Sequence, residues 1–389
     1  MKTIYADNAA TTYPRPPQVI RAMSSYLRDI GCNPGRGGYK GALDAARMVY
    51  EARSALASFF NVPSPEQVVF TPSITYSLNL VIKGLLSDGD HVLLSSMEHN
   101  AVVRPLTRLA EKNSLQIEIL PCSPEGILDP LQVKEALRPN TKLVLLTHAS
   151  NVTGTIMPVY EVGEILKHTG VFYCIDTAQT AGSEILDFQD LHCDYLAFTG
   201  HKGLLGPPGI GGLCISERAA EITKPLVEGG TGSRSEDVHQ PGFLPDKFES
   251  GTQNAPGIAG LLAGVKLITE KGLDRIKKHK TKLTDCLLNG LKTMPEATVY
   301  GTQKAESTAA VVSLNLSGMD NGEISFILEQ QYGIMTRSGL HCAPLAHKTI
   351  GTFPQGTIRI SFGFQSKLWE VEKIVSALCD ILKTASKSS

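Results

Sequence analysis

Several hallmarks of membrane, secreted and nucleic-acid-binding proteins are missing from this sequence of 389 residues. No apolar run approaches the roughly 20 residues that a membrane-spanning helix needs, and no apolar segment with a small-residue cleavage site opens the chain. Lysines and arginines number 37 against 38 aspartates and glutamates, so no excess charge attracts nucleic acid or an anionic membrane. We therefore expect a cytoplasmic protein with neither a membrane nor a nucleic-acid partner.

The eight cysteines are scattered and include no C-x-x-C pair. Their spacing indicates neither a disulfide scaffold nor a zinc site, so no metal site is expected. Most of them are expected to be reduced and buried as small hydrophobic side chains. What remains is the composition of an ordinary globular chain, 42% hydrophobic and 19% charged, and long enough for about two domains.

Strand-like and helix-like segments alternate between residues 43 and 215. This alternation predicts an α/β fold in which a mainly parallel sheet lies between helices. Expected strands cover residues 67–70, 91–94, 117–120, 142–147, 171–176, 194–199 and 212–215, and expected helices cover 43–60, 75–86, 102–112, 129–137 and 159–168.

The pattern changes near Pro256. One long helix is expected from about residue 258 to residue 291, followed by a smaller α+β unit. We predict a large domain over residues 15–255 and a small domain formed by residues 1–14 and 256–389. The expected strands of the small domain are 309–315 and 356–361, and its expected helices are 323–331 and 368–383.

Two strand ends carry chemically distinctive side chains. Asp176 closes the apolar strand 171–176, and ligands of open α/β sheets bind where such strands end. Lys202 follows the strand 194–199 and precedes a glycine-rich loop, where backbone can approach a ligand closely. The aspartate could instead cap a turn, and the lysine could be a surface residue or a phosphate ligand in an NTPase. No G-x-x-x-x-G-K-[ST] motif occurs, which disfavours the NTPase.

The two segments together suit the cofactor pyridoxal 5′-phosphate (PLP). A lysine amine forms a Schiff base with the aldehyde of PLP. A carboxylate facing the pyridine nitrogen keeps that nitrogen protonated, so that the ring acts as an electron sink. Thr199 and His201 could supply donors for the phosphate. We therefore predict a PLP site with Lys202 as the Schiff-base lysine and Asp176 as the partner of the ring nitrogen.

At this point the sequence resembles a known family. Asp176-Thr177-Ala178-Gln179 and Thr199-Gly200-His201-Lys202 resemble the PLP signature of class-V aminotransferases, and within them the chain is similar to cysteine desulfurases and selenocysteine lyases. The resemblance extends from the opening segment, residues 5–12, to the strand that contains Arg359. It implies the PLP-dependent transferase fold of type I, with a seven-stranded type of sheet, and a homodimer.

The resemblance also implies roles around the cofactor ring. His99 would stack on the ring and is counted, with Lys202, among the catalytic residues. Asn151 would lie near the cofactor hydroxyl and the substrate. Gln179 would hydrogen-bond the ring hydroxyl, while Asp176 pairs with the ring nitrogen.

A second implied group holds the phosphate of the cofactor. Thr75, Thr199 and His201 would bind it, together with the backbone N–H of Ile74. Relatives often carry a second threonine where this chain has Ile74, so one hydroxyl contact is lost. Thr252, in the segment 248–254, would reach the phosphate of the neighbouring subunit in a homodimer.

The segment 337–344, Arg-Ser-Gly-Leu-His-Cys-Ala-Pro, is the second informative stretch. A cation or base near a thiol raises its reactive thiolate fraction, although the residues alone favour a buried structural cysteine, since most free cysteines are inert. The form R-x-G-x-H-C-A resembles the desulfurases with a short, rigid loop, which implies that Cys342 is a nucleophile. Arg359 would bind the substrate carboxylate as a two-pronged donor, or else form a surface salt bridge.

These features predict a PLP-dependent cysteine desulfurase that converts L-cysteine to L-alanine and leaves the sulfur on Cys342 as a persulfide. A selenocysteine lyase, or another transaminase or β-lyase of the same fold, remains an alternative. A non-catalytic sulfur carrier is disfavoured because Lys202, Asp176 and Cys342 are all present. A sulfur-acceptor protein would be a further partner, and the sequence does not identify it.

Overall fold

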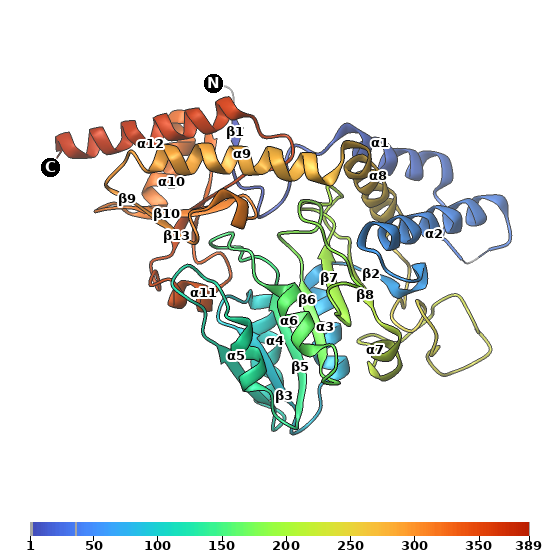
Figure 1. Ribbon diagram of the computed structural model, residues 1–389. Coiled ribbons are helices and arrows are strands. Elements are labelled where there is room, and N and C mark those ends of the chain that lie inside the picture. The colour runs from blue at the N-terminus through green and yellow to red at the C-terminus, as the bar shows by residue number, and fades with distance from the viewer. Residues whose placement is uncertain (1–2, 36, 389) are drawn as a thin grey trace.

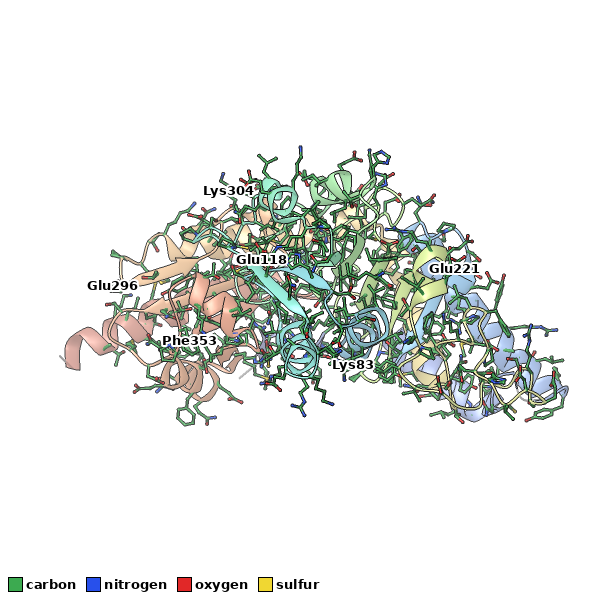
Figure 2. All side chains as sticks on the ribbon, turned by 90° about the horizontal axis from the view of Figure 1, so that it is seen from below. Lys83, Glu118, Glu221, Glu296, Lys304 and Phe353 are labelled. Atoms are coloured by element: carbon green, nitrogen blue, oxygen red, sulfur yellow. The ribbon has the colours of Figure 1, made fainter. Side chains whose placement is uncertain are left out.

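A computed structural model describes residues 3–35 and 37–388 (Figure 1). It contains a seven-stranded sheet with helices on both faces and a four-stranded sheet covered by helices. Polar side chains such as Lys83, Glu221 and Glu296 lie on the outside (Figure 2). No helix within the described ranges is both long and apolar enough to cross a membrane.

The large sheet is mainly parallel, which confirms the predicted fold class. Its strand order is β2-β8-β7-β6-β5-β3-β4, in which β8 is antiparallel to both of its neighbours and the other adjacent pairs are parallel. The strands are β2 (Val68–Thr71), β3 (His91–Ser95), β4 (Gln116–Leu120), β5 (Thr141–Thr147), β6 (Phe172–Asp176), β7 (Tyr195–Thr199) and β8 (Gly211–Ile215).

Apolar side chains of this sheet are buried on both faces. In β5, Val144 and Leu146 join the core on one face, whereas Leu143 and Leu145 join the core on the other, as the alternation of a strand requires. The first face is covered by α2 (Lys40–Phe60), α5 (Pro130–Ala136), α6 (Val159–Leu166) and α8 (Ala255–Lys271), and the second by α3 (Ile74–Leu85), α4 (Asn100–Ala110) and α7 (Glu217–Ile222). Helix α1 (Pro17–Ser25) and the π-helical turn Tyr26–Ile30 pack near α8.

The prediction of one long helix from residue 258 to residue 291 is wrong. Helix α8 ends at Lys271, and α9 (Leu273–Leu291) begins after Gly272. Gly272 has φ +81°, a conformation that interrupts a helix and favours glycine. The apolar spacing continues across the break, because α8 packs on the large sheet while Leu287 of α9 packs on the small one. Periodicity alone therefore could not reveal two helices.

The small sheet is antiparallel and lies beneath three helices. Its strand order is β12-β13-β10-β9, and the N-terminal strand β1 pairs beside it with β11. The strands are β1 (Ile4–Tyr5), β9 (Ala297–Tyr300), β10 (Val311–Leu316), β11 (Ile334–Met335), β12 (Arg337–Gly339) and β13 (Thr357–Ser361), and the helices are α9, α10 (Asn321–Tyr332) and α12 (Leu368–Ser388), with α11 (Pro344–Thr349) after the Cys342 loop.

The division into domains at residues 14 and 256 stays a prediction, and residues 1–2 and 389 of the predicted small domain lie outside the described residues. Ile258, Leu261 and Ile268 of α8 belong to the hydrophobic core of the large sheet. We therefore propose that the second boundary lies near Gly272. The N-terminal strand, in contrast, packs in the core of the small sheet through Ile4.

Candidate active site

The carboxyl ends of β6 and β7 bring the predicted cofactor residues to one edge of the large sheet. Asp176 is the last residue of β6 and is in register with Thr147 of β5 and Ala197 of β7. Thr199 ends β7, and Lys202 follows in the next loop. Because parallel strands end at the same edge, this is the part of an α/β sheet where a ligand binds.

The N-terminal segment forms hydrogen bonds to the loop that carries Lys202. Thr12 donates from Oγ1 to the Lys202 carbonyl (2.8 Å) and from its backbone N–H to the His201 carbonyl (3.0 Å). Arg15 donates to the same His201 carbonyl (2.7 Å) and to Thr11 Oγ1 (2.6 Å). His201 Nδ1 lies 3.0 Å from Thr11 Oγ1. The backbone of this irregular loop is thus held in place at His201 and Lys202.

Lys202 and Asp176 influence each other electrostatically. Burial lowers the pKa of Lys202 to about 8, and the charge of Asp176 opposes this shift. Burial also raises the pKa of Asp176. The hydrogen bond that its Oδ1 accepts from the Ala178 N–H (2.9 Å) and the positive charge of Lys202 oppose this rise. With a pKa of about 8, Lys202 keeps a fraction of its neutral, nucleophilic amine near pH 7.

His99 is held in one orientation at the start of α4. Its Nδ1 accepts a hydrogen bond from the Ala101 N–H (3.0 Å), so the proton of the neutral ring is assigned to Nε2. Burial lowers the pKa of His99 to about 4, and the charges of Lys202 and Arg337 add to the shift. At pH 7 the ring is therefore neutral, as an imidazole stacked on an aromatic cofactor would be.

The buried carboxyl of Glu98 supports the turn that carries His99. Its Oε1 accepts from Ser95 Oγ (2.5 Å) and from the Thr147 N–H (2.9 Å), which links β3 to β5. Burial raises the pKa of Glu98 to about 8, while those two hydrogen bonds oppose the shift. The carboxyl is therefore largely protonated at pH 7, and it adds little negative charge near Asp176.

Arg359 reaches the site from the small sheet. Arg359 is only 1% exposed. The alternative prediction, that it forms a surface salt bridge, is therefore wrong. The guanidinium is paired with Asp7 Oδ1 (2.6 Å) and donates to the Asn151 carbonyl (3.0 Å). Its buried Nε and the side-chain oxygen of Asn151 have no partner among the described residues.

The Cys342 loop is anchored to the large sheet. Asn151 donates from Nδ2 to the His341 carbonyl (2.7 Å), and the Asn100 N–H donates to the Cys342 carbonyl (2.8 Å). His341 and Cys342 both have positive φ, +48° and +59°, which is unusual for two consecutive residues with side chains. The Cys342 side chain is exposed, and Arg337 Nη2 lies 3.8 Å from its sulfur. The interpretation of Cys342 as a buried structural cysteine is therefore wrong.

Three of the residues predicted to bind a phosphate, Ile74, Thr75 and Thr199, lie near the place where β2 and β7 flank β8. Gly211 of β8 is in register with Thr71 and with Thr199, and a Cβ on Gly211 would lie 3.1 Å from the Ile74 nitrogen. Ile74 and Thr75 form the first turn of α3, where free N–H groups favour an anion. The buried hydroxyl of Thr199 has no partner among the described residues.

Residues 4–374 match the family model described as aminotransferase class V. The chain belongs to this family. A probable cysteine desulfurase from Pyrococcus abyssi is 35% identical over 395 positions, which cover 100% of this chain and 96% of that protein. One from Methanothermobacter thermautotrophicus is 34% identical over 97% of this chain and 94% of that protein. The apo structure of a cysteine desulfurase from Thermococcus onnurineus is 36% identical, with a TM-score of 0.92, and covers 98% of this chain and 95% of that one. The resemblance drawn from the strand-end motifs is thus confirmed over both sheets.

Two further predicted residues of this class-V chain are Gln179 and Thr252. Gln179 donates from Nε2 to the Ala9 carbonyl (3.2 Å), so its amide is engaged by the N-terminal segment. Thr252 is exposed on a loop near Tyr76 and Phe248. Neither position tests the role predicted for these two residues.

Sequence reasoning missed Asp7 and Arg337 as parts of the site. Asp7 belongs to the opening segment that resembles the family, and its charge raises the pKa of Lys202 while that of Arg337 lowers it. The signal for Asp7 was its place in that segment, and the signal for Arg337 was the first position of R-x-G-x-H-C-A. Neither signal gives the distance to Lys202, because that depends on how the two sheets meet.

A buried ion pair ties the Thr252 segment to the large sheet. The side chains of Arg53 and Glu249 are 6% and 5% exposed. Glu249 accepts hydrogen bonds from Arg53 (2.7 Å), from the Phe70 N–H (2.6 Å) and from Gln253. Phe70 lies in β2, which leads to α3, so one carboxylate fixes two of the segments predicted to touch the phosphate.

Arg53→Met is expected to destabilise the protein by about 3–5 kcal/mol, because it leaves the Glu249 carboxylate buried without its cation. Thermal unfolding of both proteins checks this as a lower midpoint for the variant. Arg47→Met is the matched control on the same helix, since Arg47 is 77% exposed in its pair with Asp44; its effect should stay below about 1 kcal/mol. Equal midpoints for the two variants would contradict a structural role of the buried pair.

Proposed function

We propose that this chain is a PLP-dependent cysteine desulfurase, which converts L-cysteine to L-alanine and takes up the sulfur as a persulfide on Cys342. The observation that carries the proposal is the position of Arg337. Its guanidinium lies 3.8 Å from the Cys342 sulfur, and its charge lowers the pKa values of Lys202 and His99. Arg337 thus contacts the exposed thiol and also acts on the charge of the buried amine, which supports one site shared by the two groups. The relatives named above, two described as probable cysteine desulfurases and one as a cysteine desulfurase, support the same reaction.

The buried polar atoms of this proposed site fit PLP. Within residues 3–35 and 37–388, Asn151 Oδ1 and Thr199 Oγ1 are buried without hydrogen-bond partners, and Lys202 and Asp176 form no ion pair with each other although each shifts the other's pKa. A polar aromatic ring between them would satisfy these groups. When bound, PLP supplies an electron sink for the electron pair left at the substrate Cα.

Each predicted residue then has a place in holding the cofactor. Lys202 would form the Schiff base, Asp176 would face the ring nitrogen, and His99 would stack on the ring. Asn151 would lie near the ring hydroxyl, and Gln179 would hydrogen-bond to it. The phosphate would be held by Thr75, Thr199, His201 and the N–H of Ile74.

The remaining chemistry falls to side chains of this chain. The neutral amine of Lys202 would carry the substrate Cα proton, and Arg359 would bind the substrate carboxylate with the N–H groups that Asp7 and Asn151 leave free. The sulfur of Cys342 would form a bond to the substrate sulfur while the Cβ–S bond breaks. One thiol and one cysteine give one persulfide and one alanine, so no further oxidant is needed.

We also propose a homodimer, in which Thr252 would reach the phosphate bound in the partner subunit. Thr252 is exposed, and exposed apolar side chains gather on α1, the adjoining π-helical turn and α2: Ile20 (54%), Leu27 (64%) and Tyr50 (55%). The cytoplasm suits such an enzyme, because all eight cysteines are free thiols. The persulfide sulfur would pass on to an acceptor protein.

Absorbance and product analysis together test this function. Protein reconstituted with PLP should be yellow, and adding L-cysteine should change the spectrum, release alanine and add one sulfur atom to the Cys342 peptide in a mass spectrum. Selenocysteine, assayed separately, tests the alternative substrate. Pyruvate in place of alanine would show an eliminating lyase, turnover of selenocysteine alone would show a selenocysteine lyase, and a protein that stays colourless would overturn the PLP assignment.

A further inference from the structure

The turn that carries Cys342 has a backbone conformation that its side chains do not favour. A hydrogen bond from the Ala343 N–H to the Leu340 carbonyl (2.9 Å) closes the turn. Its two central residues, His341 and Cys342, have φ +48° and +59°. Positive φ at both central positions is the pattern of a type I′ turn, which favours asparagine and glycine there. The surroundings must therefore hold the turn in this form.

The buried ring of His341 makes one of the contacts that hold the turn. Its Nε2 lies 3.1 Å from the carbonyl and 3.2 Å from Oγ1 of Thr357, at the start of β13. A carbonyl oxygen can only accept, so Nε2 carries the proton of the neutral ring. Thr357 Oγ1 donates to Ser313 Oγ (3.0 Å), which donates to the Val152 carbonyl (2.7 Å). The ring is thus bonded to the small sheet and, through it, to the loop after β5.

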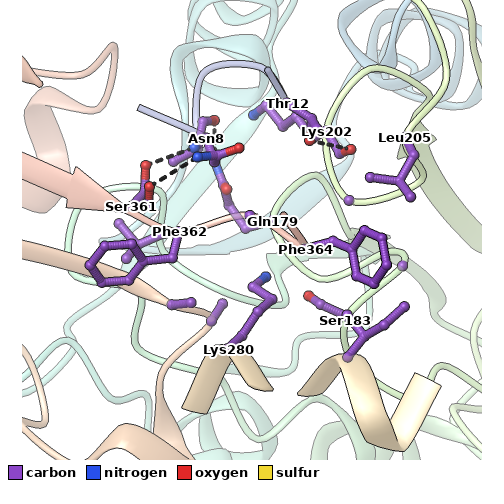
Figure 3. Close-up of a pocket in the computed structure, with 18 residues that line it drawn as sticks. Asn8, Thr12, Gln179, Ser183, Lys202, Leu205, Lys280, Ser361, Phe362 and Phe364 are labelled. Carbon is purple, nitrogen blue, oxygen red and sulfur yellow. Dashed lines mark hydrogen bonds between the residues drawn. The ribbon is translucent and has the colours of Figure 1, made fainter. Parts of the chain in front are cut away.

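The strand that holds this ring is itself fixed at its other end. Asn8 Nδ2 donates to the Ser361 carbonyl (3.3 Å), as Figure 3 shows. Ser361 Oγ also accepts from the Ala9 N–H (2.8 Å). Because β13 runs from Thr357 to Ser361, the opening segment steadies the strand to which the His341 ring is bonded.

His347 of helix α11 contacts the same turn. It is fully buried, and its ring centroid lies 5.6 Å from that of His341. Its Nδ1 lies 2.7 Å from Thr352 Oγ1, and its carbonyl accepts from the Thr352 N–H (2.8 Å). Burial lowers the pKa of His347 to about 4, and a contact with the Leu340 backbone opposes that shift. The ring is therefore fixed by Thr352 and lies against the first two residues of the turn.

Neither histidine supplies a positive charge to the thiol near pH 7. Burial lowers the pKa of His341 to about 2, so both rings are neutral. The cation beside the sulfur is Arg337, whose Nη2 lies 3.8 Å from Cys342 Sγ. The two rings can therefore act on Cys342 through its position and not through charge.

We infer that His347 is a positioning residue for the thiol of Cys342 and acts through the ring of His341. Without the His347 ring, the His341 ring loses the support on one side, and the turn can relax toward ordinary negative φ. The thiol would then lie farther from the substrate sulfur, whereas the Lys202 amine on the large sheet would keep its place. This inference rests on the proposed desulfurase function and adds one residue to it.

Two rates measured on the PLP-loaded protein test the link to the reaction. His347→Ala should lower alanine formation about 10–100-fold, because a small misplacement of a reacting group is costly. Exchange of the substrate Cα proton in deuterated water should stay near the wild-type rate, because it needs Lys202 alone. His347→Gln, whose amide can still bond Thr352, should recover part of the lost rate. Lys348→Met, at the exposed neighbouring position, should keep both rates.

Thr352→Val provides a milder variant that keeps the volume of the core. It removes only the hydroxyl beside the His347 ring, so alanine formation should fall about 2–10-fold with exchange retained. If His347→Ala does not fold, this variant decides by the same two rates. Equal losses of both rates would mean that His347 supports the fold as a whole, and full alanine formation would mean that it does not act on the thiol. Either result would overturn the inference.

Amide hydrogen exchange tests the turn without any turnover. The Ala343 N–H closes the turn, so it should exchange about tenfold faster or more in His347→Ala than in the wild type. Lys348→Met should match the wild type. An unchanged rate at Ala343 would overturn the inference. If the wild type formed no alanine, the proposed function would fail, and this measurement would still decide whether His347 holds the turn.

Discussion

Lys202→Ala is expected to abolish the conversion of L-cysteine to alanine, with a loss on the order of 10⁴-fold or more. Lys202 is the amine proposed both to hold PLP and to carry the substrate Cα proton. Its pKa of about 8 supplies the neutral form that both tasks need. The substitution removes both functions together. The loss of activity should therefore exceed the loss caused by removing any single hydrogen bond in the site.

The assay of this variant needs PLP in excess, so that weaker retention of the cofactor is not scored as lost chemistry. Lys202→Arg keeps a positive charge but cannot form a Schiff base, and it should be equally inactive. Lys266→Ala is a control on α8, where the lysine side chain is 58% exposed, and it should turn over like the wild type. Activity of Lys202→Ala close to that of the control would show that another amine binds PLP and carries the substrate Cα proton.

The sequence predicted the large sheet and its strand ends well, for a physical reason. Strands such as β5 and β6 are buried on both faces, so they read as short, continuous apolar runs. Polar residues that close such runs stand out, which is how Asp176 and Lys202 were found. A two-residue strand such as β11 leaves too few residues for any pattern, and it was missed.

Pairing between distant side chains could not be predicted. Arg359 and Asp7 are 352 residues apart in the chain, and Arg53 and Glu249 are 196 apart. Charged residues are common enough that a sequence offers many possible partners for each. For Arg359, the partner is decided by how β13 packs beside the opening segment, which is a property of the tertiary fold.

The conformation of the Cys342 loop was also beyond the sequence. A motif identifies the residue but not its positive φ, which residues with side chains adopt only when their surroundings hold them there. Here the carbonyls of His341 and Cys342 accept hydrogen bonds from Asn151 and Asn100 of the large sheet unit. The thiol is therefore presented by contacts between the two sheet units, and its position should depend little on the sulfhydryl itself.

Cys342→Ser is expected to reduce alanine and persulfide formation on the order of 10³-fold or more, while the protein stays yellow with bound PLP. Serine keeps the hydrogen bond that the Cys342 carbonyl accepts from the Asn100 N–H, and its hydroxyl can still accept from Arg337. Its hydroxyl oxygen cannot accept sulfur as a persulfide. Because the side chain is exposed, stability should change by less than about 0.5 kcal/mol.

Exchange of the substrate Cα proton with deuterated water separates this variant from the lysine variant. Removing the proton needs Lys202 but not Cys342, so Cys342→Ser should keep the exchange that Lys202→Ala loses. Cys286→Ser, a half-buried cysteine of α9, should keep both exchange and alanine formation. Full alanine formation by Cys342→Ser would assign the sulfur to another acceptor. Loss of exchange in Cys342→Ser would mean that the thiol also acts on the substrate Cα proton. The proposal that Lys202 alone carries this proton would then be wrong.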